Sequence, residues 1–217
     1  MIKAAIFDMD GTITDTEKCN VEYWIAASKE FGYDVAEEDI LYIRSLEAKK
    51  SAAYLASKYD GFDYYAVREV RRRFMREYVD SHGVDPKPGV EELLTYLKSR
   101  GIKIALATAT KYEHAERYMK ELGFFDLFDK IVCTSMVEHG KPAPDVFLYA
   151  CESVGERPED CLAVEDSPNG IRSASSAGCR TVMVPDLTPA DDELKSLIVA
   201  EVPSLSDIIG LIESGRL

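Results

Sequence analysis

Two aspartates at the end of an apolar run are the first residues in this sequence whose types and spacing could do chemistry. The run Ile2 to Phe7 has the composition of a buried strand, and Asp8 and Asp10 follow it directly. Because side chains of an extended chain alternate in direction, carboxylates at positions i and i+2 share a face. Two carboxylates this close repel each other unless a cation or a proton lies between them. Mg2+, a hard cation that prefers oxygen ligands, is therefore expected where Gly11 lets the chain turn.

Three further apolar stretches are followed by groups that suit a phosphate or a metal ion. These stretches, at residues 102–107, 130–133 and 161–164, have the continuous apolar character of buried strands. The residues that come after them are Thr108, Lys141, Glu165 and Asp166. Each has a structural alternative, because a threonine or aspartate at this place can cap the next helix and a loop lysine is usually solvated. Together with Asp8 and Asp10, however, these residues place side chains that can bind a phosphate or a metal ion after all four predicted strands.

The spacing of apolar residues divides the chain into two regions with different predicted secondary structure. From Thr16 to about Asp80 apolar residues recur at steps of three and four, which predicts helices and no strand. After the turn-rich segment 81–89, helices alternate with short apolar strands. Such alternation predicts an α/β fold with a parallel sheet covered by helices on both faces. Ligands of such sheets bind beyond the carboxyl ends of the strands, where the candidate residues stand.

Composition narrows the classes of function. The chain has 217 residues, 46% of them hydrophobic, and a formal net charge of −13. That charge argues against binding to nucleic acid or to an anionic membrane. The five cysteines show no CxxC spacing, which indicates reduced thiols. No apolar stretch is long enough to span a bilayer and no signal peptide precedes the first strand, so a cytoplasmic protein is expected.

The stretch Phe7-Asp8-Met9-Asp10-Gly11-Thr12 resembles the first motif of the haloacid dehalogenase-like superfamily of phosphohydrolases and phosphomutases. Thr108, Lys141 and the pair Glu165-Asp166 match the other three motifs in order. The resemblance covers nearly the whole chain. It implies a Rossmann-like core at residues 1–15 and 82–217 with helices on both faces, and an inserted α-helical cap at residues 16–81.

The resemblance also implies roles for the site residues. Asp8 would be the nucleophile that becomes an aspartyl phosphate, and Asp10 the general acid and base. Thr108, Lys141 and the backbone N–H of Ala109 would hold the transferring phosphoryl oxygens. The cofactor would be Mg2+, bound by Asp8, by the backbone carbonyl of Asp10 and by Asp166. Glu165 would be a further ligand or a support for the site.

Within the superfamily, the motifs are similar to the branch of beta-phosphoglucomutases, phosphoglycolate phosphatases and small sugar-phosphate phosphatases. Arg44 stands where this branch often places a cap residue that reaches the substrate. Asn20 stands where the mutases carry a histidine, and the stretch 43–47 lacks their glycine-rich, lysine-bearing form. These differences favour a phosphatase, with a phosphomutase as the alternative. A helical cap of this size suggests that the substrate is a small phosphorylated metabolite.

Other classes explain less of the sequence. Dehalogenases need no metal, which would leave Asp10 and the Glu165-Asp166 pair without a purpose. A phosphoacceptor signalling module of the receiver type also combines an aspartate, a hydroxyl, a lysine and Mg2+ on a parallel sheet. It lacks the second aspartate at i+2 and the helical cap, so it remains the weaker alternative. A monomer is the expected oligomeric state.

Overall fold

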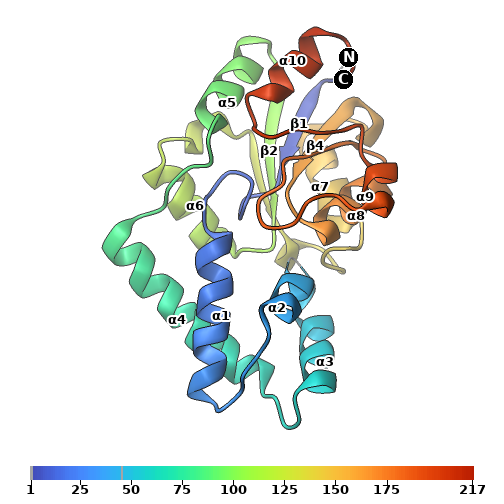
Figure 1. Ribbon diagram of the computed structural model, residues 1–217. Coiled ribbons are helices and arrows are strands. Elements are labelled where there is room, and N and C mark those ends of the chain that lie inside the picture. Colours follow the sequence, from blue (N-terminus) through green and yellow to red (C-terminus); the bar gives the residue numbers. More distant parts are fainter. Residues whose placement is uncertain (1, 45) are drawn as a thin grey trace.

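A parallel sheet forms the centre of the molecule (Figure 1). The computed structural model describes residues 2–44 and 46–217, so Met1 of the expected core and Ser45 of the expected cap lie outside the described residues. The strand order is β3-β2-β1-β4-β5-β6, and all neighbouring pairs are parallel. The strands are β1 (Ala4–Phe7), β2 (Lys103–Thr108), β3 (Lys130–Cys133), β4 (Cys161–Glu165), β5 (Arg180–Met183) and β6 (Ala200–Glu201). The predicted Rossmann-like α/β fold is confirmed.

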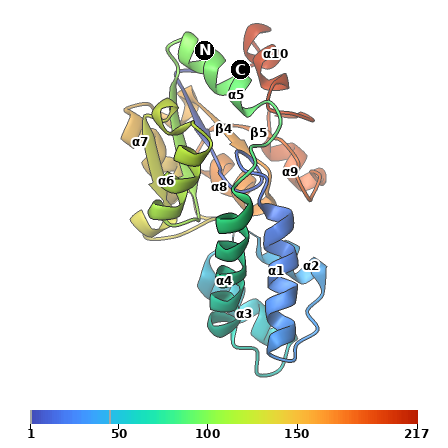
Figure 2. The same cartoon turned by 90° about the vertical axis from the view of Figure 1, so that its left-hand side faces the viewer.

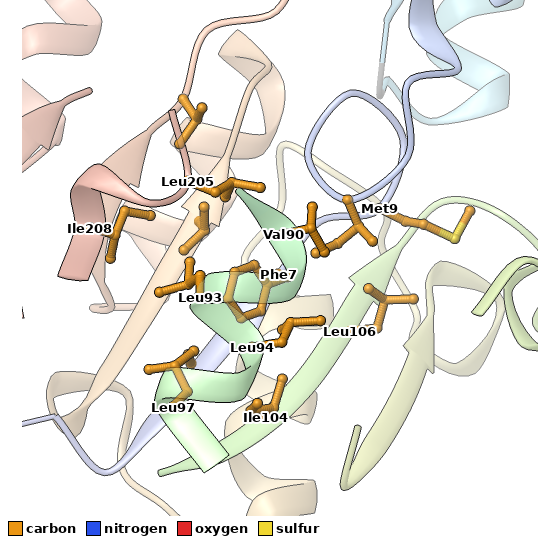
Figure 3. Close-up of a cluster of buried hydrophobic side chains, with 14 of the residues drawn as sticks. Phe7, Met9, Val90, Leu93, Leu94, Leu97, Ile104, Leu106, Leu205 and Ile208 are labelled. Carbon is orange, nitrogen blue, oxygen red and sulfur yellow. The ribbon is translucent and has the colours of Figure 1, made fainter. Parts of the chain in front are cut away.

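Helices cover both faces of the sheet because the strands are apolar on both sides. In β1, Ala5 and Phe7 belong to one hydrophobic cluster, and Ala4 and Ile6 belong to another. The covering helices are α5 (Val90–Ser99), α6 (Tyr112–Glu121), α7 (Asp145–Val154), α8 (Pro168–Ser176), α9 (Asp192–Leu197) and α10 (Asp207–Glu213). Short 3-10 turns lie at η1 (Phe125–Leu127), η2 (Thr134–Met136) and η3 (Pro158–Asp160). Figure 3 shows α5 side chains packed around Phe7.

Four helices project from the end of the sheet where β1 leads into the site (Figures 1 and 2). They are α1 (Glu17–Glu30), α2 (Glu37–Ile43), α3 (Ala48–Lys58) and α4 (Tyr64–His82). α1 and α4 lie side by side in both views. A hydrophobic cluster of their own includes Trp24, Leu55 and Val67. This separate cluster supports the division into a cap at residues 16–81 and a core at residues 1–15 and 82–217, which we propose.

Some elements differ from the sequence-based expectation. The helical region that was expected to end at about Asp80 continues to His82, and Val79 near the end of α4 is buried against the core cluster. The elements α9 and β6 were not expected. In α9 only Leu194 is buried, so no apolar period marks it, and β6 is two residues long. In the described ranges 2–44 and 46–217, no helix is both long and apolar enough to cross a membrane.

Candidate active site

An ammonium group lies buried between two carboxylates at the centre of the site. Lys141 follows β3 in sequence, and its side chain has no solvent exposure. Its Nζ donates hydrogen bonds to Asp8 Oδ1, to Glu165 Oε1 at 2.6 Å and to the carbonyl oxygen of Ala107 at 3.0 Å. Three acceptors match the three protons that an ammonium can donate. Lys141 is therefore a fixed cation beside Asp8, not the solvated loop residue that its sequence context also permitted.

Glu165 is held at both of its carboxylate oxygens. Oε1 accepts the hydrogen bond from Lys141, and Oε2 accepts from the Asp166 N–H, the Ser167 N–H and the Ser167 hydroxyl, each at 3.0 Å. The backbone of Gly170, in the first turn of α8, lies so close that a Cβ there would overlap the Glu165 carboxylate. Glu165 thus orders the turn between β4 and α8 and orients Lys141.

A cluster of three carboxylates can hold a divalent cation. Asp8, Glu165 and Asp166 are buried, and one oxygen of each lies within 4.8 Å of the others. Burial raises the pKa of Asp8 and of Asp166 well above the usual range; Lys141 and Arg44 respectively oppose the shift, and neighbouring carboxylates add to it. Asp166 Oδ2 is buried and accepts no hydrogen bond from any residue that the structure describes, although the Arg44 guanidinium is paired with it at 3.2 Å. An oxygen donor set with one unsatisfied buried oxygen fits a hard cation such as Mg2+.

The turn after β1 fits closely around this cluster. Gly11 has φ +85°, and a Cβ on it would come within 2.5 Å of Asp166 Oδ2. Glycine meets both requirements, because it adopts positive φ at little cost and leaves room for the carboxylate. The Thr12 hydroxyl donates to Asp166 Oδ1 at 3.3 Å. The turn after β1 therefore packs against Asp166 at the end of β4 and forms a hydrogen bond with it.

The carboxylate of Asp10 turns away from the cation cluster and toward the cleft. Its Oδ1 accepts a hydrogen bond from the Thr16 hydroxyl and its Oδ2 one from the Thr110 hydroxyl, both at 2.7 Å. The Asp10 side chain is therefore not a member of the cation cluster formed by Asp8, Glu165 and Asp166. The sequence analysis assigned no role to Thr16 or Thr110, although each stands within four residues of a motif residue.

Thr108 and Ala109 lie at the end of β2. Thr108 is fully buried, and its Oγ1 accepts a hydrogen bond from the Thr110 N–H at 3.0 Å. This contact stabilises the turn after β2 and is not a cap of the next helix, because α6 begins at Tyr112 and its N-cap residue is Lys111. Ala109 is exposed and lines the cleft beside Asp10 and Thr110.

Arg44 reaches the carboxylate cluster from the end of α2. Its Nη1 lies 3.2 Å from Asp166 Oδ2, and its Nη2 donates to the carbonyl oxygen of Asp166 at 3.3 Å. The Asn169 amide holds the Arg44 carbonyl oxygen at 2.9 Å. The structure therefore brings Arg44 to the site, with Asp166 as its direct partner.

Glu17 is a site residue that the sequence analysis missed, because an acidic residue in the first turn of a helix commonly has a structural role. It lines the cleft together with Asp8 and Arg44. Burial raises its pKa to about 8; Arg44 opposes this shift, and the Asp10 and Asp8 carboxylates add to it. Its Oε1 accepts a hydrogen bond from the Asn20 amide at 3.3 Å.

The cleft consists of two adjoining pockets of about 140 and 160 Å3. The inner pocket contains Asp8, and both pockets are lined by Asp10 and Asn20. Asn20 Oδ1 accepts a hydrogen bond from Arg71 Nη1 at 2.7 Å. Of the predicted substrate-binding residues, Asn20, Ala109 and Arg44 line the cleft, whereas Thr108 and Lys141 are buried behind it.

Comparison with known proteins identifies the family. Residues 2–178 match the haloacid dehalogenase-like hydrolases. The chain belongs to this family. The phosphorylated carbohydrates phosphatase of Thermotoga maritima is 30% identical to this haloacid dehalogenase-like hydrolase over 181 residues, 83% of this chain and 84% of the relative. The beta-phosphoglucomutase of Bacillus subtilis is 33% identical over 190 residues, 84% of this chain and 83% of the relative.

A solved structure shows the same likeness. The beta-phosphoglucomutase of Clostridium difficile superimposes with a TM-score of 0.82 at 26% identity, covering 100% of this chain and 97% of the other. The predicted superfamily and branch are confirmed. So is the predicted class of enzyme, a haloacid dehalogenase-like phosphohydrolase with a phosphomutase as the alternative.

Proposed function

We propose that this hydrolase is a Mg2+-dependent phosphatase that cleaves a small phosphate monoester, a sugar phosphate, through an aspartyl phosphate on Asp8. One observation carries the proposal. Asp8 accepts a hydrogen bond from a fully buried ammonium and belongs to a cluster of three carboxylates, while Asp10 is held separately by two hydroxyls at the cleft. Two carboxylates from one turn thus have different environments, which suits one for attack and the other for proton transfer.

In the first step an Asp8 carboxylate oxygen attacks phosphorus, the bond to the leaving oxygen breaks, and Asp10 donates its proton to the departing alcohol. Lys141 orients Asp8 and supplies positive charge beside the transferring oxygens. The backbone N–H of Ala109, an exposed residue that lines the cleft, would donate to the same oxygens, and the Thr108 hydroxyl supports the turn that contains it.

In the second step Asp10 takes a proton from water as the water oxygen attacks the phosphorus of the aspartyl phosphate. The bond to Asp8 breaks, and inorganic phosphate and the Asp8 carboxylate are released. Mg2+, which Asp8, Asp166 and the backbone carbonyl of Asp10 would hold, supplies charge that offsets the phosphoryl oxygens and the carboxylates. We assign Glu165 the supporting role, because four donors already occupy its two oxygens.

Asn20 favours water over a sugar hydroxyl as the acceptor. It stands where mutases of this branch carry a titratable histidine, and its amide is engaged by Glu17 and Arg71. A side-chain amide cannot shuttle a proton at neutral pH. A phosphomutase of the beta-phosphoglucomutase type is the alternative function, and the relatives of that name in Bacillus subtilis and Clostridium difficile support it. A signalling phosphoacceptor is the weaker alternative, since it has no need of Asp10.

The cleft and the composition support proposals on the size of the substrate, the oligomeric state, the partners and the cellular compartment. The helices α1, α2 and α4 line the cleft above Asp8, which leaves room for a small metabolite. We propose a monomer with no nucleic-acid or membrane partner, in keeping with the net charge of −13. The cysteines in the described part of the chain are unpaired, which suits a reducing cytoplasm.

A phosphate-release screen tests the function. It compares sugar phosphates, nucleoside monophosphates and phosphoglycolate with and without Mg2+, and we expect release to need the metal. A coupled mutase assay with beta-glucose 1-phosphate and its bisphosphate activator runs beside it. Net isomerisation faster than phosphate release would overturn the phosphatase assignment in favour of the mutase.

A further inference from the structure

Asn169, in the first turn of α8, joins the core to the helices of the cap. Its side-chain amide donates to the carbonyl oxygen of Tyr42 at 3.4 Å and to that of Arg44 at 2.9 Å, across 127 and 125 positions of sequence. Both carbonyls stand at the C-terminal end of α2, where the last carbonyls of a helix have no partner within the helix. The core thus supplies a hydrogen-bond donor to the end of a cap helix.

Asn169 is not needed to begin its own helix. The N-cap of α8 is Ser167, whose hydroxyl accepts the Gly170 N–H at 3.1 Å, and Pro168 occupies the first helical position. Asparagine is favoured at a helix N-terminus mainly for that capping contact. Because Ser167 already makes it, the contacts of the Asn169 amide serve the cap and not α8.

The end of α2 that Asn169 binds forms part of the wall of the inner pocket. That pocket contains Asp8, and its lining includes Ile43, Arg44 and Leu46. The Arg44 side chain is buried, and its guanidinium meets both the carboxylate and the carbonyl oxygen of Asp166. The backbone of Arg44 is therefore held by α8 while its side chain lies against the carboxylate cluster.

A second contact docks the start of α3 on the core. Glu47, the N-cap residue of α3, donates its backbone N–H to the Lys141 carbonyl oxygen at 3.2 Å. The neighbouring Gly140 is close enough that a Cβ there would lie 3.7 Å from Glu47 Cβ. This contact joins two backbone groups, whereas Asn169 contributes a side chain that a substitution can replace.

We propose that Asn169 is a positioning residue of the reaction, which docks the end of α2 on the core and thereby fixes Arg44 at the cleft. This inference rests on the proposed phosphatase function and adds a residue that acts through Arg44. The hydrogen bonds of Asn169 are the same with bound ester and in the transition state, so their loss should weaken binding and leave the chemical step nearly unchanged. Without them, binding of the ester would also have to order the end of α2.

The test measures KM and kcat for glucose 6-phosphate and p-nitrophenyl phosphate in the presence of Mg2+. Asn169→Ala removes the amide, and Asn169→Asp keeps its shape but turns an acceptor toward two carbonyl oxygens. In both variants we expect KM to rise about 3- to 10-fold, the effect of one neutral hydrogen bond, and kcat to change by less than about twofold. Asn169→Gln keeps the amide on a longer stem and should recover part of the loss.

Two comparisons separate positioning from folding. Arg172→Met removes from the same helix a guanidinium that is paired with Glu193 of α9 at 2.9 Å, a contact within the core, and it should leave KM unchanged. Asn169→Ala combined with Arg44→Ala should have the KM of Arg44→Ala alone to within about twofold, because Asn169 acts through Arg44 and the two effects do not add.

Trp24 provides a readout that needs no turnover. It is the only tryptophan in the sequence, its residue is 8% exposed, and it lines the inner pocket together with Arg44. The acrylamide quenching constant of its fluorescence should rise in Asn169→Ala and in Asn169→Asp, since a cap that is held less firmly admits the quencher to the pocket. In Arg172→Met the quenching constant should stay at the wild-type value.

The outcomes separate the positioning role from the function on which it rests. Wild-type KM or wild-type quenching in Asn169→Asp, with p-nitrophenyl phosphate still hydrolysed, would overturn the positioning role and leave the phosphatase standing. A fall in kcat at unchanged KM, or effects of Asn169→Ala and Arg44→Ala that multiply, would overturn it as well. Failure of the wild type to hydrolyse any ester would overturn the phosphatase, and the quenching of Trp24 would still decide whether Asn169 holds the cap.

Discussion

Replacement of Lys141 tests how far the buried ammonium holds the site together. Lys141→Met replaces the lysine with an uncharged side chain of similar length. The Lys141 side chain has 0% exposure, and its ammonium is paired with the buried carboxylates of Asp8 and Glu165. The substitution leaves two buried carboxylates without their shared partner. Breaking a buried ion pair by removing one partner costs about 3 to 5 kcal/mol. For a chain of this size that corresponds to a fall in Tm of roughly 6 to 20 °C.

Lys3 provides a matched control. Its ammonium is paired with Asp160 at 2.9 Å, a distance similar to that between Lys141 and Glu165, but its side chain is 55% exposed. Water and ions screen such a pair, so Lys3→Met should cost less than about 1 kcal/mol. The same substitution at two lysines therefore separates burial from pairing.

Urea unfolding at pH 7 measures the free energy of unfolding for the wild type and both variants, and phosphate release measures activity. We expect Lys141→Met to lose activity by about 100- to 1,000-fold, the effect of removing one preorganised charged or hydrogen-bonding group from a reaction centre. Adding Glu165→Gln should recover part of the lost stability, because it removes one of the two unpaired charges. If Lys141→Met were as stable as Lys3→Met, the view of Lys141 as the electrostatic centre of the site would be wrong.

Three further changes have defined outcomes. Asp8→Asn should abolish phosphate release while the circular dichroism spectrum and Tm stay near wild type; residual activity within about tenfold of wild type would show that Asp8 is not the nucleophile. Gly170→Ala places a methyl group on the Glu165 carboxylate and should destabilise the chain by about 1 to 3 kcal/mol in urea unfolding, whereas Gly210→Ala, with open space around it, should not. Because the pKa of Glu17 is raised from 4.5 to about 8, the metal-free folded protein keeps a proton that the unfolded chain releases, and it loses stability as the pH rises between these values. Mg2+ offsets the ionised carboxylates, so it should raise Tm more at pH 8 than at pH 5, and an equal shift at both would count against the cation site.

The sheet was largely predictable because its signals are local. Each of the strands β1 to β5 is a short apolar run next to a turn or a helix, and continuous apolar character predicts a strand buried on both faces. The strand β6 and helix α9 were missed for the same reason. Two residues of strand and a helix with one buried leucine carry no periodic pattern, and they are defined by contacts with β5 and α8.

The convergence of the candidate site residues was predictable from topology. Parallel strands bring their carboxyl ends to one edge, so the residues after β1, β2 and β4 were expected to meet. The roles that depend on orientation were not predictable. Thr110 bonds Asp10 across 100 positions of sequence, and Arg71 bonds Asn20 across 51. Such contacts depend on how the turn after β2 and one face of α4 are positioned relative to the turn after β1 and to α1. No local sequence pattern predicts these relative positions.

The sequence by itself determined the class of fold, the order of the motifs and the side chains that could carry phosphoryl transfer, because these depend on residue type and local period. Only the tertiary structure decided what each group faces. It turned Asp10 away from the cation cluster, fixed Lys141 between Asp8 and Glu165, and buried Glu17 at the cleft. It also placed the Arg71 guanidinium more than 4.0 Å from every carboxylate oxygen of the described residues. The physical reason is that burial and charge pairing are properties of three-dimensional neighbourhoods, which form only when segments far apart in the chain pack together.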